Sequence, residues 1–471
     1  MARPRTSEEK YEQMLNTPIR RLICQLAIPT MISMLVTSVY NMADTYFVGK
    51  IGTSATGGVG VAFPLMMIIQ AIGFTFGMGS GNRISRLLGQ KEEDEAAKVA
   101  STGFFTTFFL GCVLAVIGLI FLDPLVELLG ATETIAPYAK DYIQYILIGT
   151  PFMASSFVLN NVLRYQGSAF YAMLGIATGG ILNIGLDPLF MFTFGFGTAG
   201  AAMATILSQF ISFCILLFNQ GKNGNLRLTI KNFSPKWEMY KEILKIGLPS
   251  FYRQGIASIA TVLLNFAAGG YGDAAIAAMS VVSKVLMLAF SALLGFGQGF
   301  QPACGFNYGA KKYDRVREGF WFCVRTGAIG LAVLCLIAFP FSEQIITIFR
   351  RGDPEVIRIG ALALRLNLAV FPLQAWVVVC NMFMQNIGEV RTASILSLAR
   401  QGLFFIPAIL TLPHFFGLFG VQITQPAADL ATFCLALPLG IKVLGRLKAL
   451  EESENAPPQM EQLSSESEGD I

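Results

Sequence analysis

The chain has 471 residues, of which 54% are hydrophobic and 14% are charged, and its mean hydropathy is +0.58. Water-soluble domains carry about 25% charged residues, so this composition excludes an ordinary soluble protein and predicts a membrane protein. The net charge of +4 comes largely from connecting loops and gives no reason to expect nucleic acid as a partner. The single histidine, His414, excludes a histidine-based metal site, and the eight cysteines form no Cys-x-x-Cys pair. We expect no cofactor.

Apolar runs of about 20 residues, long enough to cross a bilayer, occur twelve times. They lie near residues 22–48, 54–80, 97–122, 136–163, 168–193, 197–218, 245–268, 276–301, 317–341, 357–385, 391–412 and 417–444. Six runs fall in each half of the chain. The sequence therefore predicts an all-α membrane protein with twelve transmembrane helices in two six-helix bundles.

The two halves repeat each other at a nearly constant distance. Pro29 returns as Pro249 and Gly89 as Gly309, in both cases 220 residues later, and Pro151 returns as Pro372, 221 residues later. Because an even number of crossings brings the chain back to its starting side, the repeat is parallel, with a pseudo-twofold axis along the membrane normal. Many secondary transporters are built from two related halves and bind substrate and coupling ion near the surface between them.

Lysine and arginine concentrate before the first run, in alternate loops and after the last run. By the positive-inside rule both termini are cytoplasmic, in a multi-pass protein of the plasma membrane. We expect a cytoplasmic segment over 1–21, a first lobe over 22–218, a cytoplasmic linker over 219–244, a second lobe over 245–444 and a disordered acidic tail over 445–471. We expect a monomer surrounded by membrane lipids.

No nucleotide-binding motif of the form G-x-x-x-x-G-K-[S/T] occurs, and the polar stretches are too short for a nucleotide-hydrolysing domain. Any transport must therefore draw on an ion gradient or on the gradient of the substrate itself.

Two carboxylates lie inside apolar runs of the first half, where a charged side chain costs roughly 2.5 to 3.5 kcal/mol on insertion scales. Asp44 lies about four residues from the outer end of the first run and Asp187 about six from that of the fifth, so their depths differ by about 3 Å. Tyr40 and Asn183 each precede one of these aspartates by one helical turn. The two aspartates can therefore share one cavity.

Tyr142 and Thr205 reach the same depth in the fourth and sixth runs. Together these side chains form an oxygen-rich cluster that suits a proton or a hard cation such as Na⁺, and not a transition metal. Burial beside a second carboxylate favours the protonated acid, so we expect at least one aspartate to take up a proton near physiological pH. The alternative is that both aspartates only form hydrogen bonds in helix packing.

The ionisable side chains within the apolar runs of the second half are mostly positively charged. Leu264 and Ala408 stand where the repeat would place the two aspartates, while several lysines and arginines lie within or at the edges of its runs. Arg253 and Lys284 are candidates to line a cavity. Lys284 lies near the outer end of its run, so its ammonium group could instead reach the outer membrane surface. Arg400 and Asp429 both lie near the middle of their runs, and we expect them to form a structural ion pair.

Three short sequence motifs resemble motifs of the multidrug and toxic compound extrusion (MATE) family. They are Tyr40-Asn-Met-Ala-Asp44, Asn160-Asn-Val-Leu-Arg-Tyr-Gln-Gly167 and Asn183-x-x-x-Asp187-Pro188-Leu-Phe. The resemblance spans about residues 15 to 445 and is nearest to the damage-inducible-type prokaryotic branch, whose first lobe carries the essential acids. It implies that Asp44 and Asp187 couple inward cation movement to efflux. It further implies that Asn183 and Thr205 help form the cation site, lined by Tyr40, Tyr142 and Asn160.

The resemblance implies a secondary active antiporter that exports amphipathic, often cationic organic compounds in exchange for H⁺ or Na⁺ by alternating access. The main alternative is a flippase of lipid-linked precursors, which Arg253 and Lys284 keep open because such proteins often use cationic cavities. A membrane-embedded enzyme is a third reading, but the chain offers no nucleophile, metal site or acid–base set beyond the paired aspartates.

Overall fold

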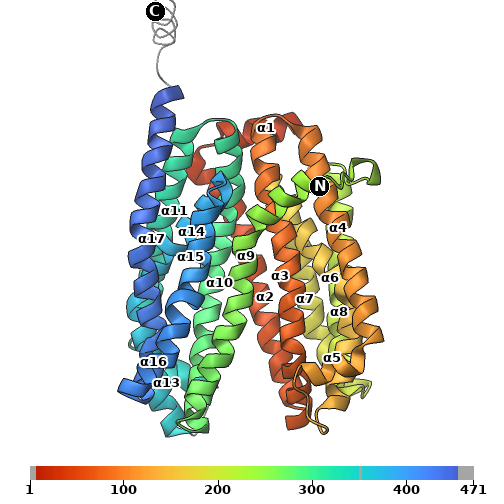
Figure 1. Cartoon of the computed structure of the whole chain (residues 1–471), viewed down its shortest axis with the longest axis vertical. Helices are drawn as coiled ribbons and strands as arrows, with labels where there is room; N and C mark the ends of the chain where they lie inside the picture. Colours follow the sequence, from red (N-terminus) through yellow and green to blue (C-terminus); the bar gives the residue numbers. More distant parts are fainter. Residues whose placement is uncertain (1–6, 350–352, 455–471) are drawn as a thin grey trace, which may run out of the picture.

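The computed structural model describes residues 7–349 and 353–454, and over these residues it contains helices and connections without a strand. The helices stand side by side in two bundles, one drawn from red to yellow-green and the other from green to blue (Figure 1). The predicted all-α fold class is confirmed.

The first bundle follows a short helix, α1 (Ser7–Asn16), that lies at one end of the molecule. It comprises α2 (Ile19–Gly49), α3 (Thr53–Gly89), α4 (Glu93–Ile120), α5 (Leu122–Leu128), α6 (Ala136–Tyr165), α7 (Ala169–Pro188) with its π-helical continuation η1 (Leu189–Thr193), and α8 (Gly197–Asn223). The second bundle follows a single 3₁₀ turn, η2 (Ile230–Asn232). It comprises α9 (Trp237–Gly269), α10 (Asp273–Gly309), α11 (Tyr313–Ala338), α12 (Ser342–Phe349), α13 (Pro354–Val370), the 3₁₀ turn η3 (Phe371–Leu373), α14 (Gln374–Ile387), α15 (Val390–Leu398), the π-helical η4 (Ala399–Phe405), α16 (Ile406–Phe416) and α17 (Leu418–Glu454).

The duplication seen in the sequence is also a duplication of backbone detail. Lys91 and Lys311 are the two non-glycine residues with positive φ in the described chain, at 64° and 58°, and both follow the long second helix of their lobe. The amide of Asn160 donates to the carbonyl of Ala172 at 3.2 Å, and that of Asn381 donates to the carbonyl of Ala393 at 2.8 Å. The repeated residues therefore hold the same turns and helix pairs in both lobes.

The closest approach of α3 to α10 shows how the lobes are related. A Cβ on Gly309 would lie 2.1 Å from the carbonyl oxygen of Arg86, and a Cβ on Gly89 would lie 2.1 Å from that of Phe306. Phe306 stands 220 residues after Arg86, as Gly309 does after Gly89. The two contacts thus exchange under the repeat, which is the pattern of an interface with a twofold axis.

Glycines bring the two lobes together elsewhere as well. A Cβ on Gly247 would lie 2.1 Å from the carbonyl oxygen of Thr75, and one on Gly299 would lie 2.2 Å from Cα of Ala27. Small residues allow membrane helices to approach this closely, because no side chain separates the backbones. The lobes are therefore closely packed where α2 meets α10 and α3 meets α9.

Eleven helical stretches of the described residues are long and apolar enough to cross a membrane. The predicted run at 245–268 is not among them; it lies in α9, which has 33 residues and packs against α3. Polar and charged residues such as Arg253 and Gln254 interrupt the apolar stretch of α9 near its middle. Its length and its place beside α3 make it the twelfth long helix of the bundle pair.

The ends of the lobes differ from the predicted boundaries. The expected disordered tail from residue 445 is wrong as far as Glu454, because α17 continues to that residue; residues 455–471 lie outside the described part. Arg317 lies 3.1 Å from Glu451 and Lys311 lies 3.3 Å from Glu454, so these ion pairs hold the last turns of α17 beside α11. The predicted N-terminal segment contains α1, whose Met14 is buried.

Candidate functional site

Close packing of α7 against α2 and α8 positions the first candidate site. An added Cβ on Gly180 would lie 3.1 Å from Cδ1 of Tyr40, and one on Gly179 would lie 2.9 Å from Cβ of Ser212. The two glycines therefore let α7 lie directly against its neighbours. This packing brings Asn183 and Asp187, one and two turns further along α7, into the interior of the first lobe.

Asn183 connects the polar side chains of this interior. Its Nδ2 donates to Oδ1 of Asp187 at 3.1 Å and to Oγ1 of Thr205 at 3.3 Å, and Thr205 donates to the carbonyl of Ala201 at 3.0 Å. Asp187 is fully buried, and Asn183 is 3% exposed. The hydrogen bonds orient both side chains and leave several of their oxygen atoms free.

Asp44 and two tyrosines complete the cluster. Asp44 lies near enough to Asp187 for the charge of one to act on the other. The buried Tyr142 lies beside both aspartates and within hydrogen-bonding reach of Thr205, and its hydroxyl contacts Sδ of Met66 at 3.7 Å. Tyr40 lies beside Asp44 and near Gln209 of α8. Five of the residues predicted from the sequence thus surround Asp187.

The chemistry of the cluster is defined by its unpaired atoms. Oδ1 of Asp44, Oδ1 of Asn183 and Oδ2 of Asp187 are buried and have no hydrogen-bond donor in the described structure. All three are acceptors, so the cluster has more acceptors than donors and no positively charged group, and it fits a proton or a hard cation bound by oxygen. Among the described residues, no group of three or more histidine, cysteine or acidic side chains is placed to hold a metal ion.

Asn160 is not part of this cluster. Its amide donates to the carbonyl of Ala172 near the start of α7, more than two turns before Gly180 and at the other end of the helix from Asp187. The same bond from Asn381 in the second lobe shows that Asn160 joins two helices and does not line the cation site. Sequence reasoning missed Gln209 and Met66 because an amide and a thioether within apolar runs carry no specific signal.

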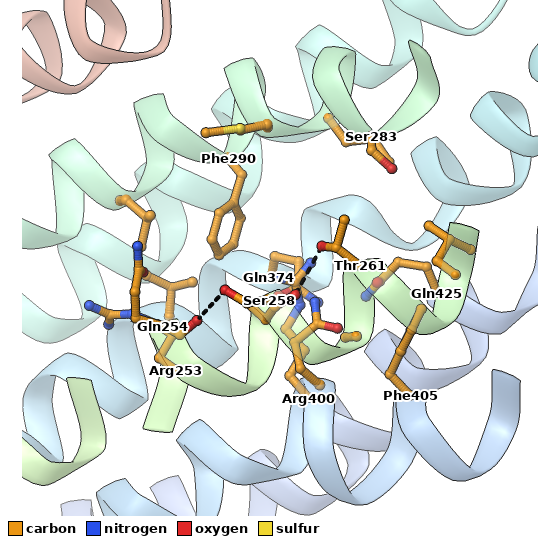
Figure 2. A pocket seen from close by; sticks show the side chains of 18 of the residues that line it. Arg253, Gln254, Ser258, Thr261, Ser283, Phe290, Gln374, Arg400, Phe405 and Gln425 are labelled. Carbon is orange, nitrogen blue, oxygen red and sulfur yellow. Dashed lines mark hydrogen bonds between the residues drawn. The ribbon is translucent and has the colours of Figure 1, made fainter. Parts of the chain in front are cut away.

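The second lobe contains a cavity of about 410 Å³ between α9, α10, α14 and η4, which also reaches Phe63 and Met67 of α3. Figure 2 shows polar and aromatic side chains around it. Arg253 lines this cavity, as we expected for a cavity residue, whereas Lys284 is not among its lining residues. The neighbouring Ser283 and Met287 of α10 line the cavity instead.

The ion pair predicted in the second lobe is present. Nε of Arg400 lies 2.8 Å from Oδ1 of Asp429, and Nε2 of Gln425 donates to the same oxygen at 2.7 Å. The guanidinium of Arg400 also stacks 4.6 Å from the ring centre of Phe290. Arg400, Gln425 and Phe290 all line the cavity, so the pair is also part of the cavity wall.

Two related helical lobes, an interface of exchanged contacts and a buried oxygen cluster in one lobe define a membrane transporter built from a parallel repeat. A family model described as MatE matches the chain twice, over residues 29–189 and 249–410. The chain belongs to this family of multi-pass membrane transporters and is not an enzyme.

Relatives and solved structures cover nearly the whole chain. The multidrug export protein MepA of Staphylococcus haemolyticus is 28% identical over 432 residues, which are 91% of this chain and 95% of that protein. MepA of Staphylococcus aureus strain N315 is 26% identical, over 88% of this chain and 92% of that protein.

Among solved structures, a MATE transporter in complex with MaL6 superposes with a TM-score of 0.88 at 27% identity, over 93% of this chain and 99% of that one. A MOP-superfamily transporter from Pyrococcus furiosus, described as having a binding pocket of reverse polarity, has a TM-score of 0.86 at 28% identity, over 93% of this chain and 98% of that one. These matches confirm the predicted family and its twelve-helix fold.

Proposed function

We propose that the protein is a secondary active multidrug efflux antiporter of the plasma membrane, with both termini in the cytoplasm. It exports amphipathic, often cationic organic compounds in exchange for H⁺ or Na⁺ by alternating access. The observation that carries the proposal is the set of three buried, unpaired acceptor oxygens on Asp44, Asn183 and Asp187. The relatives named as multidrug export proteins support the class of substrate.

The cluster acts in this proposal as the site where the coupling ion binds. A cation or proton on Asp187 neutralises the charge that acts between the two aspartates and supplies the missing partner for their free oxygens. Its arrival therefore changes the packing of α7 against α2 and α8. Two arrangements of the lobes need differ in free energy by only a few kcal/mol. Binding of the ion to one arrangement is therefore sufficient to change which arrangement is populated.

Dye transport in everted membrane vesicles tests the proposal, with the proton gradient and the sodium gradient imposed separately. We expect one of the gradients to drive dye uptake by the wild type, and Asp187→Asn to abolish that uptake, because an amide cannot neutralise or bind the ion as a carboxylate does. Asp141→Asn is the matched control: Asp141 is an exposed acid of α6, one residue before Tyr142. Unchanged uptake by Asp187→Asn would remove the core of the proposal.

A flippase of lipid-linked precursors is the second candidate function. The observation that favours it is Arg253 in a cavity whose lining contains no acidic residue. Transfer of a fluorescent lipid between leaflets of proteoliposomes, without any effect of the ion gradients on dye transport, would favour the flippase over the antiporter.

A further inference from the structure

The cavity of the second lobe occupies the place that the cation cluster occupies in the first. Ala260 and Leu264 line the cavity and stand 220 residues after Tyr40 and Asp44. The last helices keep the same register, since Phe213 and Cys214 return as Phe433 and Cys434. In this register the cavity residue Gln425 is the counterpart of Thr205. The two sites are therefore equivalent in position and different in their side chains.

The charge of the cavity is positive. Its two charged lining residues are Arg253 and Arg400, and Arg400 is neutralised by Asp429. Arg253 has no carboxylate partner in the described residues; its Nη2 lies 3.7 Å from Sδ of Met78, and Tyr165 lies nearby. The buried Arg164 lies close enough to act on Arg253 and is bonded to the neutral amides of Gln298 and Asn161. Arg253 is thus an uncompensated positive charge in the cavity wall, with its guanidinium directed toward Met78 of α3, and an opposite charge interacts with it more strongly here than in water.

Unpaired amides line the same cavity. Gln374 is fully buried, and neither its Nε2 nor its Oε1 has a hydrogen-bond partner in the described structure. Leaving a buried polar group unpaired destabilises the fold, so an unpaired amide in a cavity wall points to a partner that the free protein lacks. The sticks in Figure 2 show Gln374 among the cavity side chains. Gln374 lies directly behind the cavity surface, so a small rotation of its side chain would bring the unpaired amide to a polar group of a ligand.

Two irregular helices create these positions. The counterpart of the continuous α6 is interrupted by η3, and Gln374 is the first residue after this interruption. The π-helical η4 contains Arg400, Gln401 and Phe405, all of which line the cavity. Single π-helical turns are found frequently at functional sites, because they turn side chains away from the regular helical spacing. The cavity is therefore built by departures from regular helix in the second lobe.

The remaining wall is apolar and adaptable. Its aromatic and methionine side chains are Phe63, Met67, Met279, Met287, Phe290, Phe371 and Phe405. Flexible methionine and flat aromatic side chains suit the body of a hydrophobic molecule, and the cavity volume of about 410 Å³ is within the range of small-molecule sites.

We propose that this cavity is a second ligand site, for an amphipathic organic anion with an oxyanion head such as a carboxylate, sulfonate or phosphate. Arg253 neutralises the head, the amide of Gln374 supplies a polar contact, and the apolar wall holds the body. The proposal goes beyond cation-coupled efflux, because it assigns the second lobe a ligand of the opposite charge. Binding at this site does not depend on ion coupling.

Equilibrium binding of a fluorescent fatty acid, 11-(dansylamino)undecanoic acid, to the purified protein in phosphatidylcholine nanodiscs tests the proposal. Its methyl ester is the matched neutral ligand. We expect Arg253→Gln to weaken binding of the acid about tenfold and to leave binding of the ester unchanged, because only the acid carries a charge that the guanidinium neutralises. We expect Arg253→Lys to retain most of the affinity, and Gln374→Met to weaken binding of both ligands about threefold.

Arg391→Gln is the control for a general effect of removing charge, since Arg391 is exposed on α15. Asp187→Asn should bind the acid like the wild type even where it abolishes efflux, so a failure of the ion-coupling proposal and a failure of this one are distinguishable. Equal affinity of the wild type for acid and ester, or wild-type binding of the acid by a folded Arg253→Gln protein, would overturn the proposal.

The oxyanion head has two possible sources, a membrane lipid and a soluble amphiphile. Nanodiscs that contain phosphatidylglycerol distinguish them. Loss of acid binding in these nanodiscs, with Arg253→Lys behaving as the wild type, supports the site with a lipid as its occupant. Unchanged binding supports the site with a soluble anion as its ligand.

Discussion

Asn183 donates one amide nitrogen to both Asp187, at 3.1 Å, and Thr205, at 3.3 Å, and so joins the two helices that hold the candidate cation site. Its carbonyl oxygen remains buried and without a partner. One side chain therefore orients the acid and also presents a free oxygen to a cation. This double role makes Asn183 a sharper test of the site than the aspartates, whose replacement also removes charge.

Asn183→Leu keeps the size of the side chain and removes both the amide donor and the free oxygen. We expect ion-driven dye transport to fall at least tenfold, since losing a buried bond to a charged acceptor costs about 1.5 to 3 kcal/mol. Initial rates in everted vesicles measure the effect. Asn160→Leu is the matched control and should keep the dependence on the ion gradient; a transport loss confined to Asn160→Leu would show that the site was placed wrongly.

Asn160→Ala and Asn381→Ala should both destabilise the fold, and Asn381→Ala by more, because Asn381 also donates to Oγ of Ser397 at 2.9 Å. Each removes the equivalent side-chain bond to a backbone carbonyl, of Ala172 and Ala393 respectively, and one such bond is worth about 0.5 to 1.5 kcal/mol. Thermal unfolding of the purified proteins, followed by tryptophan fluorescence, compares them. A drop in the midpoint for one variant and none for the other would contradict the equivalence of the two turns.

Gly309→Ala should loosen the contact between α3 and α10. Its Cβ would lie 2.1 Å from the carbonyl oxygen of Arg86, and relieving such a clash costs roughly 1 to 3 kcal/mol. Labelling of Ser250→Cys in a chain without other cysteines reports the change, because Ser250 is buried and its Oγ lies 3.1 Å from Sδ of Met78 across the lobes. We expect labelling about tenfold faster than in the parent. Gly330→Ala, where an added Cβ meets nothing within 4 Å, should have no effect.

Arg400→Met and Asp429→Leu should each destabilise the second lobe by about 3 to 5 kcal/mol, because each leaves a buried charge without its partner. The double variant should be more stable than either single variant, since it removes both charges. Thermal unfolding of the three proteins gives the coupling between the residues. Additive losses would show that Arg400 and Asp429 do not act as a pair.

The sequence alone determined the class, the duplication and the location of the acidic cluster. Apolar length is a local property, and a depth in a helix follows from counting residues along it, so Asp44 and Asp187 could be placed at one level before any packing was known. The repeat predicted a pseudo-twofold axis, which the exchanged contacts of Gly89 and Gly309 display.

The tertiary structure decided which way each side chain faces. The rotation of a helix about its axis depends on the neighbours that pack against it, so the sequence could not place Asn160 at a turn, Lys284 outside the cavity lining or Gln374 beside a cavity. The interruption η3 and the π-helical η4 also depend on packing, because Pro151 and its counterpart Pro372 stand at equivalent positions and only the second interrupts its helix. The depth of each residue in the membrane could therefore be predicted from the sequence. The direction of each side chain, and the unpaired atoms that define both sites, depend on how the helices pack and required the structure.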